Sequence, residues 1–189
     1  MSDPTDITDS TDRALVLSER TRSLDTCSNQ EIISISVNGN SFESQEFASA
    51  MIRQLYFENG DLYLGSICSK VPEGFGKYVW SNGIVYEGAW RSGVRHGFGK
   101  LTWPSGSSYE GEFSGGYMHG KGIYVSASKL TYKGRFKLNL KHGLGYQLYS
   151  NGDVFEGPWI QGMPEGPGKY VWANGNTYIG NMKGGKMTG

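Results

Sequence analysis

The clearest pattern along the chain is an aromatic residue that recurs every 23 residues. Each is followed two residues later by glycine and four residues later by a bulky apolar residue, with polar residues between them. Alternation with a period of two is typical of a strand with one apolar face. The recurring positions are Tyr63, Tyr86, Tyr109, Tyr132, Phe155 and Tyr178. Six units in register without an insertion indicate a repeat architecture.

Residues 86–108 show what one repeat encodes. Tyr86, Gly88 and Trp90 share one face of a strand, residues 91–93 supply a turn, and the return strand starts at Gly97 with an apolar face of its own. Each repeat is therefore a β-hairpin, which is marginal in isolation and depends on its neighbours. We predict an all-β protein: one elongated antiparallel sheet of about twelve strands built from tandem 23-residue hairpins.

Composition divides the chain into two parts. Of the 29 glycines only one precedes residue 59, and residues 1–58 hold ten acidic and four basic residues, so the excess positive charge lies in the repeats. We predict that residues 1–51, acidic and rich in Ser and Thr, are largely disordered. Residues 52–189 form the repeat array, with a lead-in strand at 52–58 because a hairpin signal follows it.

The complete repeats are expected to start at residues 63, 86, 109, 132 and 155. A truncated repeat occupies residues 178–189, so the chain is expected to be a fragment. It has no run of 18 apolar residues, and residues 1–10 contain no apolar stretch of the kind that a secretory signal needs.

The glycine-rich stretches at residues 115–122 and 180–187 match the spacing of a phosphate-binding loop but lack the Ser or Thr that would hold Mg²⁺. Their register in the repeats favours hairpin turns. Repeat glutamates and lysines are expected to pair across strands on a solvated face. The sequence therefore predicts no catalytic residues and no cofactor within this chain.

The three histidines occupy one repeat position, so they are expected roughly 9–10 Å apart along the sheet, too far to share one zinc ion. The outer repeats carry glutamate at this position. We interpret it as a polar residue that stabilises a turn, and we predict no metal site. The residues are His96, His119, His142, Glu73 and Glu165.

One repeat departs from the others in charge. Lys133 and Arg135 replace its usual acidic residues, and Lys137 and Lys141 follow, so we expect a basic cluster with the first three side chains on one strand face. Such residues are attracted to anionic membrane surfaces. A merely solvated face is the alternative. We expect no nucleic-acid binding, because the repeats need their aromatic residues for packing.

The repeat consensus YEGxW…HGxGxxxW resembles the MORN repeat (membrane occupation and recognition nexus). Within that family the chain is similar to the amino-terminal region of plant phosphatidylinositol 4-phosphate 5-kinases. The stretches that carry the likeness are residues 150–157, 170–176, 182–187 and, before the repeats, 18–25. In those kinases a separate domain uses ATP and Mg²⁺ to phosphorylate the inositol 5-position, and that domain is absent from these residues.

The resemblance implies a regulatory module in phosphoinositide signalling that binds membranes or proteins. It also implies that the protein is cytoplasmic and associates peripherally with the plasma membrane. Its expected partners are phosphatidic acid or phosphoinositides, a kinase domain, or another protein. The alternative is a stand-alone MORN scaffold with no link to a kinase. Because the charges are opposite, residues 1–58 are expected to compete with anionic lipid for the sheet.

Overall fold

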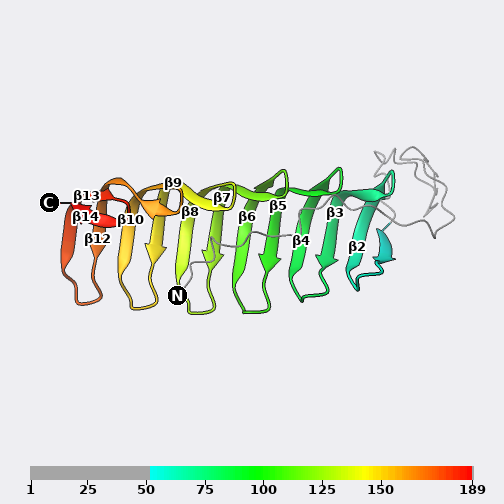
Figure 1. Ribbon diagram of the computed structural model, residues 1–189, viewed down its shortest axis with the longest axis horizontal. Coiled ribbons are helices and arrows are strands. Elements are labelled where there is room, and N and C mark those ends of the chain that lie inside the picture. Colours follow the sequence, from blue (N-terminus) through cyan, green and yellow to red (C-terminus); the bar gives the residue numbers. More distant parts are fainter. Residues whose placement is uncertain (1–51, 189) are drawn as a thin grey trace, which may run out of the picture.

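Residues 52–188 are described by the computed structural model, and they form one continuous antiparallel sheet. Figure 1 shows the hairpins side by side along the long axis of the molecule, in the order of the sequence. The predicted single elongated antiparallel sheet is confirmed. The predicted disorder of residues 1–51 and their predicted competition with lipid lie outside the described residues.

The sheet contains one more hairpin strand than the sequence predicts, and one return strand is split. β11 and β12 belong to the same return strand, interrupted at Glu165, whose backbone N–H donates to the Pro158 carbonyl oxygen at 3.0 Å. β14 adds the return strand of the last repeat. The strands are β1 (Ile52–Tyr56), β2 (Leu62–Cys68), β3 (Val71–Val79), β4 (Val85–Arg91), β5 (Val94–Thr102), β6 (Ser108–Ser114), β7 (Tyr117–Val125), β8 (Thr131–Lys137), β9 (Leu140–Leu148), β10 (Val154–Ile160), β11 (Met163–Pro164), β12 (Gly166–Val171), β13 (Thr177–Lys183) and β14 (Lys186–Thr188).

Each repeat hairpin closes with a two-residue turn in which both residues have positive φ, the type that matches the twist of the strands. Between β8 and β9 these residues are Leu138 and Asn139, with φ of 50° and 67°. Asn139 also fixes this turn to the preceding hairpin: its Oδ1 accepts from the Met118 N–H at 2.8 Å, and its own N–H donates to the Met118 oxygen at 3.1 Å. Successive hairpins are therefore tied together at their tips.

The return strand starts earlier than the sequence predicts. β5 begins at Val94 instead of Gly97, because the pairing of β4 with β5 continues past a bulge between Gly88 and Trp90. Gly97 has φ of 62°, a conformation in which glycine is favoured, and this lets the strand resume pairing on both sides of the bulge.

At the opposite ends of the strands, two of the turns are connected to the next turn through a buried carboxylate. Asp61 Oδ2 accepts from the Tyr78 hydroxyl at 2.7 Å and Oδ1 accepts from the Ser81 N–H at 2.7 Å. Asp153 repeats the arrangement with Tyr170. Burial raises the pKa of Asp61, but the hydrogen bonds to its charged form outweigh this effect and hold the pKa below its usual range.

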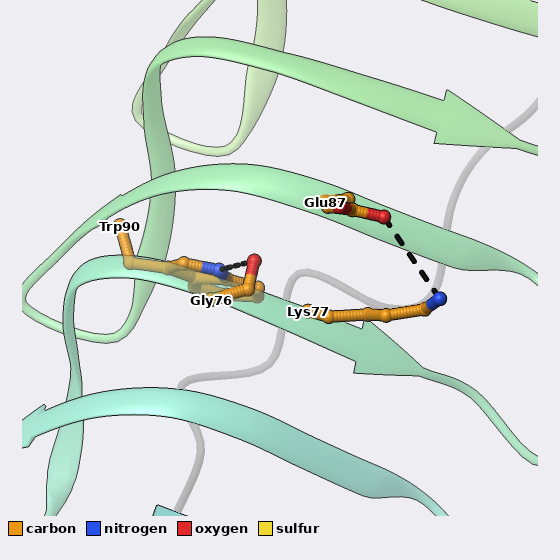
Figure 2. Close-up of polar contacts among 4 residues, drawn as sticks. All are labelled: Gly76, Lys77, Glu87 and Trp90. Atoms are coloured by element: carbon orange, nitrogen blue, oxygen red, sulfur yellow. Dashed lines mark hydrogen bonds and ion pairs between the residues drawn. The ribbon is translucent and has the colours of Figure 1, made fainter. Parts of the chain in front are cut away.

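The core lies on one face of the sheet, which we call the aromatic face: the face that carries the buried aromatic residues recurring every 23 residues. The Trp90 ring meets the rings of Tyr63 and Tyr86 edge-on, at centroid distances of 5.6 and 5.1 Å. Figure 2 shows the Trp90 indole N–H donating to the Gly76 carbonyl oxygen at 3.1 Å. Each tryptophan or phenylalanine at this position thus links two consecutive repeats.

The glycines of the aromatic face leave room for the tyrosine rings. A Cβ at Gly99 would overlap the ring and hydroxyl of Tyr86, and a Cβ at Gly88 would overlap the backbone of Gly99. The Tyr86 hydroxyl lies over these glycines and donates to the Ala89 carbonyl oxygen at 2.8 Å. Large and small side chains therefore interlock, as the spacing of the sequence predicts.

The buried tyrosine hydroxyls remain protonated donors. Tyr63 donates to the Ser66 carbonyl oxygen at 2.7 Å, and Tyr109 donates to the Glu112 carbonyl oxygen at 2.9 Å. Burial raises the pKa of Tyr63 to about 12, with a further contribution from the negative charge of Glu73. These hydroxyls serve the fold and have no acid–base role near neutral pH.

Candidate functional site

The opposite side of the sheet, which we call the open face, carries side chains that the core does not use. One lateral row crosses all the repeats, and its members pair directly across neighbouring strands. The row consists of Leu64, Lys77, Glu87, Lys100, Glu110, Ile123, Lys133, Tyr146, Glu156, Lys169 and Ile179. All of these side chains are exposed.

Most cations of this row face a carboxylate, as the sequence predicts. Glu87 lies between Lys77 and Lys100, and Lys169 lies opposite Glu156. Figure 2 shows Lys77 Nζ 3.8 Å from Glu87 Oε2, with the two side chains 47% and 71% exposed. Such an exposed, screened pair contributes at most about 1 kcal/mol to stability. Its effect is to neutralise the open face locally.

The β8 strand is different. Lys133, Arg135 and Lys137 all project onto the open face, away from the buried Tyr132 and Phe136, so their predicted alternation is confirmed. Lys133 stands opposite Ile123 on one side and Tyr146 on the other. Arg135 stands opposite Lys121, and Lys137 opposite Leu140. The strand pairing therefore places no carboxylate directly opposite any of the three within the described sheet.

Sequence reasoning missed Lys121 as a neighbour of this cluster. Lys121 lies on β7, is exposed, and pairs with Arg135. It occupies the position between the two repeat glycines Gly120 and Gly122, and because Gly122 faces the Tyr109 ring its neighbour must point to the open face. We call Lys121, Lys133, Arg135 and Lys137 the basic patch.

Lys141 does not join the basic patch. It pairs with Phe136 and therefore lies on the aromatic face, where it is 3% exposed. Its Nζ donates to Gln147 Oε1 at 2.9 Å and lies 5.1 Å from the centroid of the Trp159 ring. The predicted cluster of four thus contains three residues on one face, with Lys141 behind the sheet.

Arg95 occupies the same repeat position as Lys141, two repeats earlier, and the sequence analysis did not single it out. It is 5% exposed, and its guanidinium carbon lies 5.7 Å from the centroids of the Trp80 and Phe113 rings. A cation over aromatic faces is stabilised by the ring quadrupole. The 23-residue period is the signal that could have found both cations.

The two glutamates at the histidine position and the glycine-rich stretches belong to turns. Glu73 Oε2 accepts from the Ser92 N–H at 2.7 Å, and Glu165 Oε2 accepts from the Gly184 N–H at 2.7 Å, as expected for a turn-stabilising position. The stretches at residues 115–122 and 180–187 lie in the β6–β7 and β13–β14 hairpins, as predicted.

Two further features of the described residues concern metal binding and membrane spans. Residues 52–188 contain no group of three or more His, Cys, Asp or Glu side chains arranged to hold a metal ion. The same residues include no helix that is long and apolar enough to cross a membrane.

The repeats match a known family. Residues 70–85, 86–108, 109–131, 132–154 and 155–177 each match the MORN repeat. The chain belongs to the MORN repeat family. Four of the matched units begin at residues 86, 109, 132 and 155, where the sequence places repeat starts. In the first repeat the match begins at residue 70, and Leu64 replaces the glutamate that follows the aromatic residue in the consensus.

Within this family the chain is similar to phosphatidylinositol 4-phosphate 5-kinase 9 of Arabidopsis thaliana, with 60% identity over 68 residues. These residues are 36% of this chain and 8% of the kinase, so the chain spans less than a tenth of that relative. Among solved structures it is similar to the TCP domain of Drosophila melanogaster SAS-4, in complex with a proline-rich motif of Ana2. That likeness has 14% identity, covers 77% of this chain and 88% of the other, and has a TM-score of 0.44.

Proposed function

We propose that this chain is the membrane-binding regulatory module of a phosphatidylinositol 4-phosphate 5-kinase and that it docks on anionic phospholipid through the basic patch. Two observations support the proposal. The MORN repeats are 60% identical over 68 residues to such a kinase from Arabidopsis thaliana. On the open face, one strand, β8, carries three exposed cations with no carboxylate directly opposite them.

The main support for a membrane-docking site is the pairing register of β8 with its neighbouring strands. In the lateral row that contains Lys133, the lysines outside β8 stand opposite at least one glutamate, for example Lys100 between Glu87 and Glu110. The side chains opposite Lys133 are Ile123 and Tyr146. Each uncompensated cation near an anionic leaflet contributes about 1 kcal/mol to binding. Phosphatidic acid and phosphoinositide headgroups carry phosphate groups that suit such cations.

The test compares two triple variants with the same change in charge. Lys133→Ala/Arg135→Ala/Lys137→Ala removes three cations of the basic patch. The matched control, Lys77→Ala/Lys100→Ala/Lys169→Ala, removes three open-face lysines that stand opposite glutamates. Binding is measured by co-sedimentation with phosphatidylcholine vesicles that contain phosphatidic acid or phosphatidylinositol 4-phosphate, at low salt.

The patch variant is expected to weaken binding by between roughly tenfold and 100-fold. The control is expected to weaken binding by less than the patch variant does, because its three lysines lie outside the basic patch. Wild-type binding should fall steeply with salt, because the Debye length shrinks from about 10 Å at 0.1 M to about 3 Å at 1 M. Equal losses in the two variants, or binding that ignores salt, would contradict a docking site at the basic patch.

The regulatory part of the proposal concerns a longer protein in which these repeats accompany a lipid-kinase domain, which we call the parent protein. We place that protein in the cytoplasm and at the plasma membrane, with ATP and Mg²⁺ used by a kinase domain outside these residues. The 189 residues alone should show no lipid kinase activity above background. A coding sequence that continues into a lipid-kinase domain supports the proposal, whereas a stop codon after residue 189 leaves a MORN scaffold without a kinase.

A further inference from the structure

A second row of the open face carries bulky apolar side chains that the core does not need. Phe75 is 73% exposed, Phe98 is 61% exposed and Leu144 is 73% exposed. Each stands between two glycines of its return strand, of which the second faces the buried aromatic ring of the same repeat. The apolar side chain must therefore point to the open face, so packing of the core does not explain why it is large.

These three side chains share their row with two cations of the basic patch. The strand pairs that define the row are Phe75 with Ala89, Phe98 with Glu112, Lys121 with Arg135, Leu144 with Pro158 and Pro167 with Asn181. Since neighbouring strands are about 4.8 Å apart, Phe75 and Phe98 are separated by roughly 10 Å and Phe98 and Leu144 by roughly 19 Å. Lys121 and Arg135 lie between Phe98 and Leu144 together with one carboxylate, that of Glu112, whose Oε1 accepts from the Lys121 backbone N–H at 3.0 Å.

The spacing favours a membrane over a protein as the surface that this row contacts. Protein-binding hot spots cluster in a well-packed patch that excludes water. Here the apolar side chains stand about one or two repeats apart, with charged side chains between Phe98 and Leu144, so they do not form such a cluster. A bilayer surface can accept separate anchors, because each ring enters the headgroup–acyl boundary independently and the cations meet headgroup phosphates.

We propose that Phe75, Phe98 and Leu144 insert into the headgroup–acyl boundary of an anionic bilayer, while Lys121 and Arg135 bind lipid phosphates in the same row. This inference rests on the proposed function and adds the mode of contact: the open face from β3 to β9 lies on the membrane and is held by apolar insertion as well as by charge. Apolar burial is insensitive to screening, so part of the affinity should survive high salt.

The test replaces the three anchors and compares them with exposed apolar residues elsewhere. The row variant is Phe75→Ser/Phe98→Ser/Leu144→Ser. The control is Ile160→Ser/Met163→Ser/Ile179→Ser, at open-face residues that are 51%, 54% and 79% exposed and lie outside the row, in the hairpins beyond Leu144. Insertion is measured as the rise in surface pressure of a phosphatidylcholine–phosphatidic acid monolayer, and affinity by vesicle co-sedimentation at low salt and at 0.5 M NaCl.

Wild type and control should raise the surface pressure and keep measurable vesicle binding at high salt. The row variant should raise it little, bind at least roughly tenfold more weakly, and lose binding at high salt. Its thermal unfolding midpoint should stay close to that of wild type, because the replaced side chains are mostly exposed.

The outcomes separate the two proposals. If wild type binds anionic vesicles but neither inserts nor responds to the row substitutions, the insertion is overturned and the docking through the basic patch stands. The row would then be a surface for a protein. If wild type binds no anionic vesicle, both proposals are overturned.

Discussion

The aromatic face and the open face are built from alternate residues of the same strands, and they follow different rules. On the aromatic face each position is tied to its neighbours: the Trp90 ring contacts three tyrosines, and Gly99 must stay small beneath the Tyr86 ring. On the open face the same repeat position holds Glu110 in one unit and Lys133 in the next. The fold is therefore specified by one face, which leaves the other free to carry a function.

The two faces are expected to differ most in the stability that is lost when a large aromatic side chain is truncated. Trp90 and Phe98, in one hairpin, give this comparison. Trp90→Ala should lower the free energy of unfolding by about 3–5 kcal/mol, because it removes a buried side chain that links two repeats. Phe98→Ala should lower it by less than about 1 kcal/mol, because Phe98 is 61% exposed. Urea unfolding followed by tryptophan fluorescence and circular dichroism measures both. Similar losses would mean that the open face also stabilises the fold.

A smaller effect is expected when a side chain is added. Gly99→Ala should destabilise the sheet by about 1–3 kcal/mol, because the new Cβ overlaps the Tyr86 ring. The adjacent Lys100→Ala, on the open face, should change stability by less than about 0.5 kcal/mol. Thermal unfolding midpoints of the two variants give the comparison. A tolerated Gly99→Ala would show that the ring can move aside.

The buried carboxylate of Asp61 makes the contact between the first two turns at its end of the sheet sensitive to pH. Its pKa is lowered in the folded state, so its contribution is present above the unfolded pKa of about 3.9 and is lost as pH falls through the folded value. Asp61→Asn should lower stability at pH 7 by about 1–2 kcal/mol, with the difference from wild type shrinking below about pH 4. Unfolding midpoints at pH 7, 5 and 3 measure this. A constant difference would contradict a charged Asp61.

The smallest expected effect is at the tip of the basic hairpin. Leu138 has φ of 50° in its two-residue turn, a conformation that costs a residue with a Cβ roughly 1–2 kcal/mol. Leu138→Gly removes this strain, partly offset by the greater freedom of glycine in the unfolded chain, so stability should rise by about 0.5–1 kcal/mol. The same measurement on Lys137→Ala, next to the turn, should show no gain. A destabilised Leu138→Gly would mean that the leucine side chain stabilises the tip.

The aromatic face could be predicted from the sequence because it obeys simple alternation within each strand. Tyr86, Gly88 and Trp90 lie on one face in the order that their spacing indicates. The start of the return strand at Val94 could not be read in the same way. A bulge lets pairing resume after an irregular stretch. Neither the bulge nor the register beyond it can be predicted from the alternation of apolar and polar residues.

The candidate site was predicted in part for the same reason. Lys133, Arg135 and Lys137 belong to one strand, so alternation places them correctly. Lys141 lies beyond a turn with positive φ and is placed by its pairing with Phe136, which is visible only in the structure. The glycines around Phe75 and Phe98 dominate the repeat pattern and obscure these two aromatic residues. Their position between paired glycines nevertheless implies that they lie on the open face.

The most direct test of the division between the faces measures folding and lipid binding on the same variant, Lys133→Ala/Arg135→Ala/Lys137→Ala. The unfolding midpoint should match that of wild type, while the dissociation constant for vesicles containing phosphatidic acid should rise by roughly tenfold to 100-fold. Unchanged vesicle affinity, or a loss of affinity that accompanies an equal loss of stability, would contradict the account.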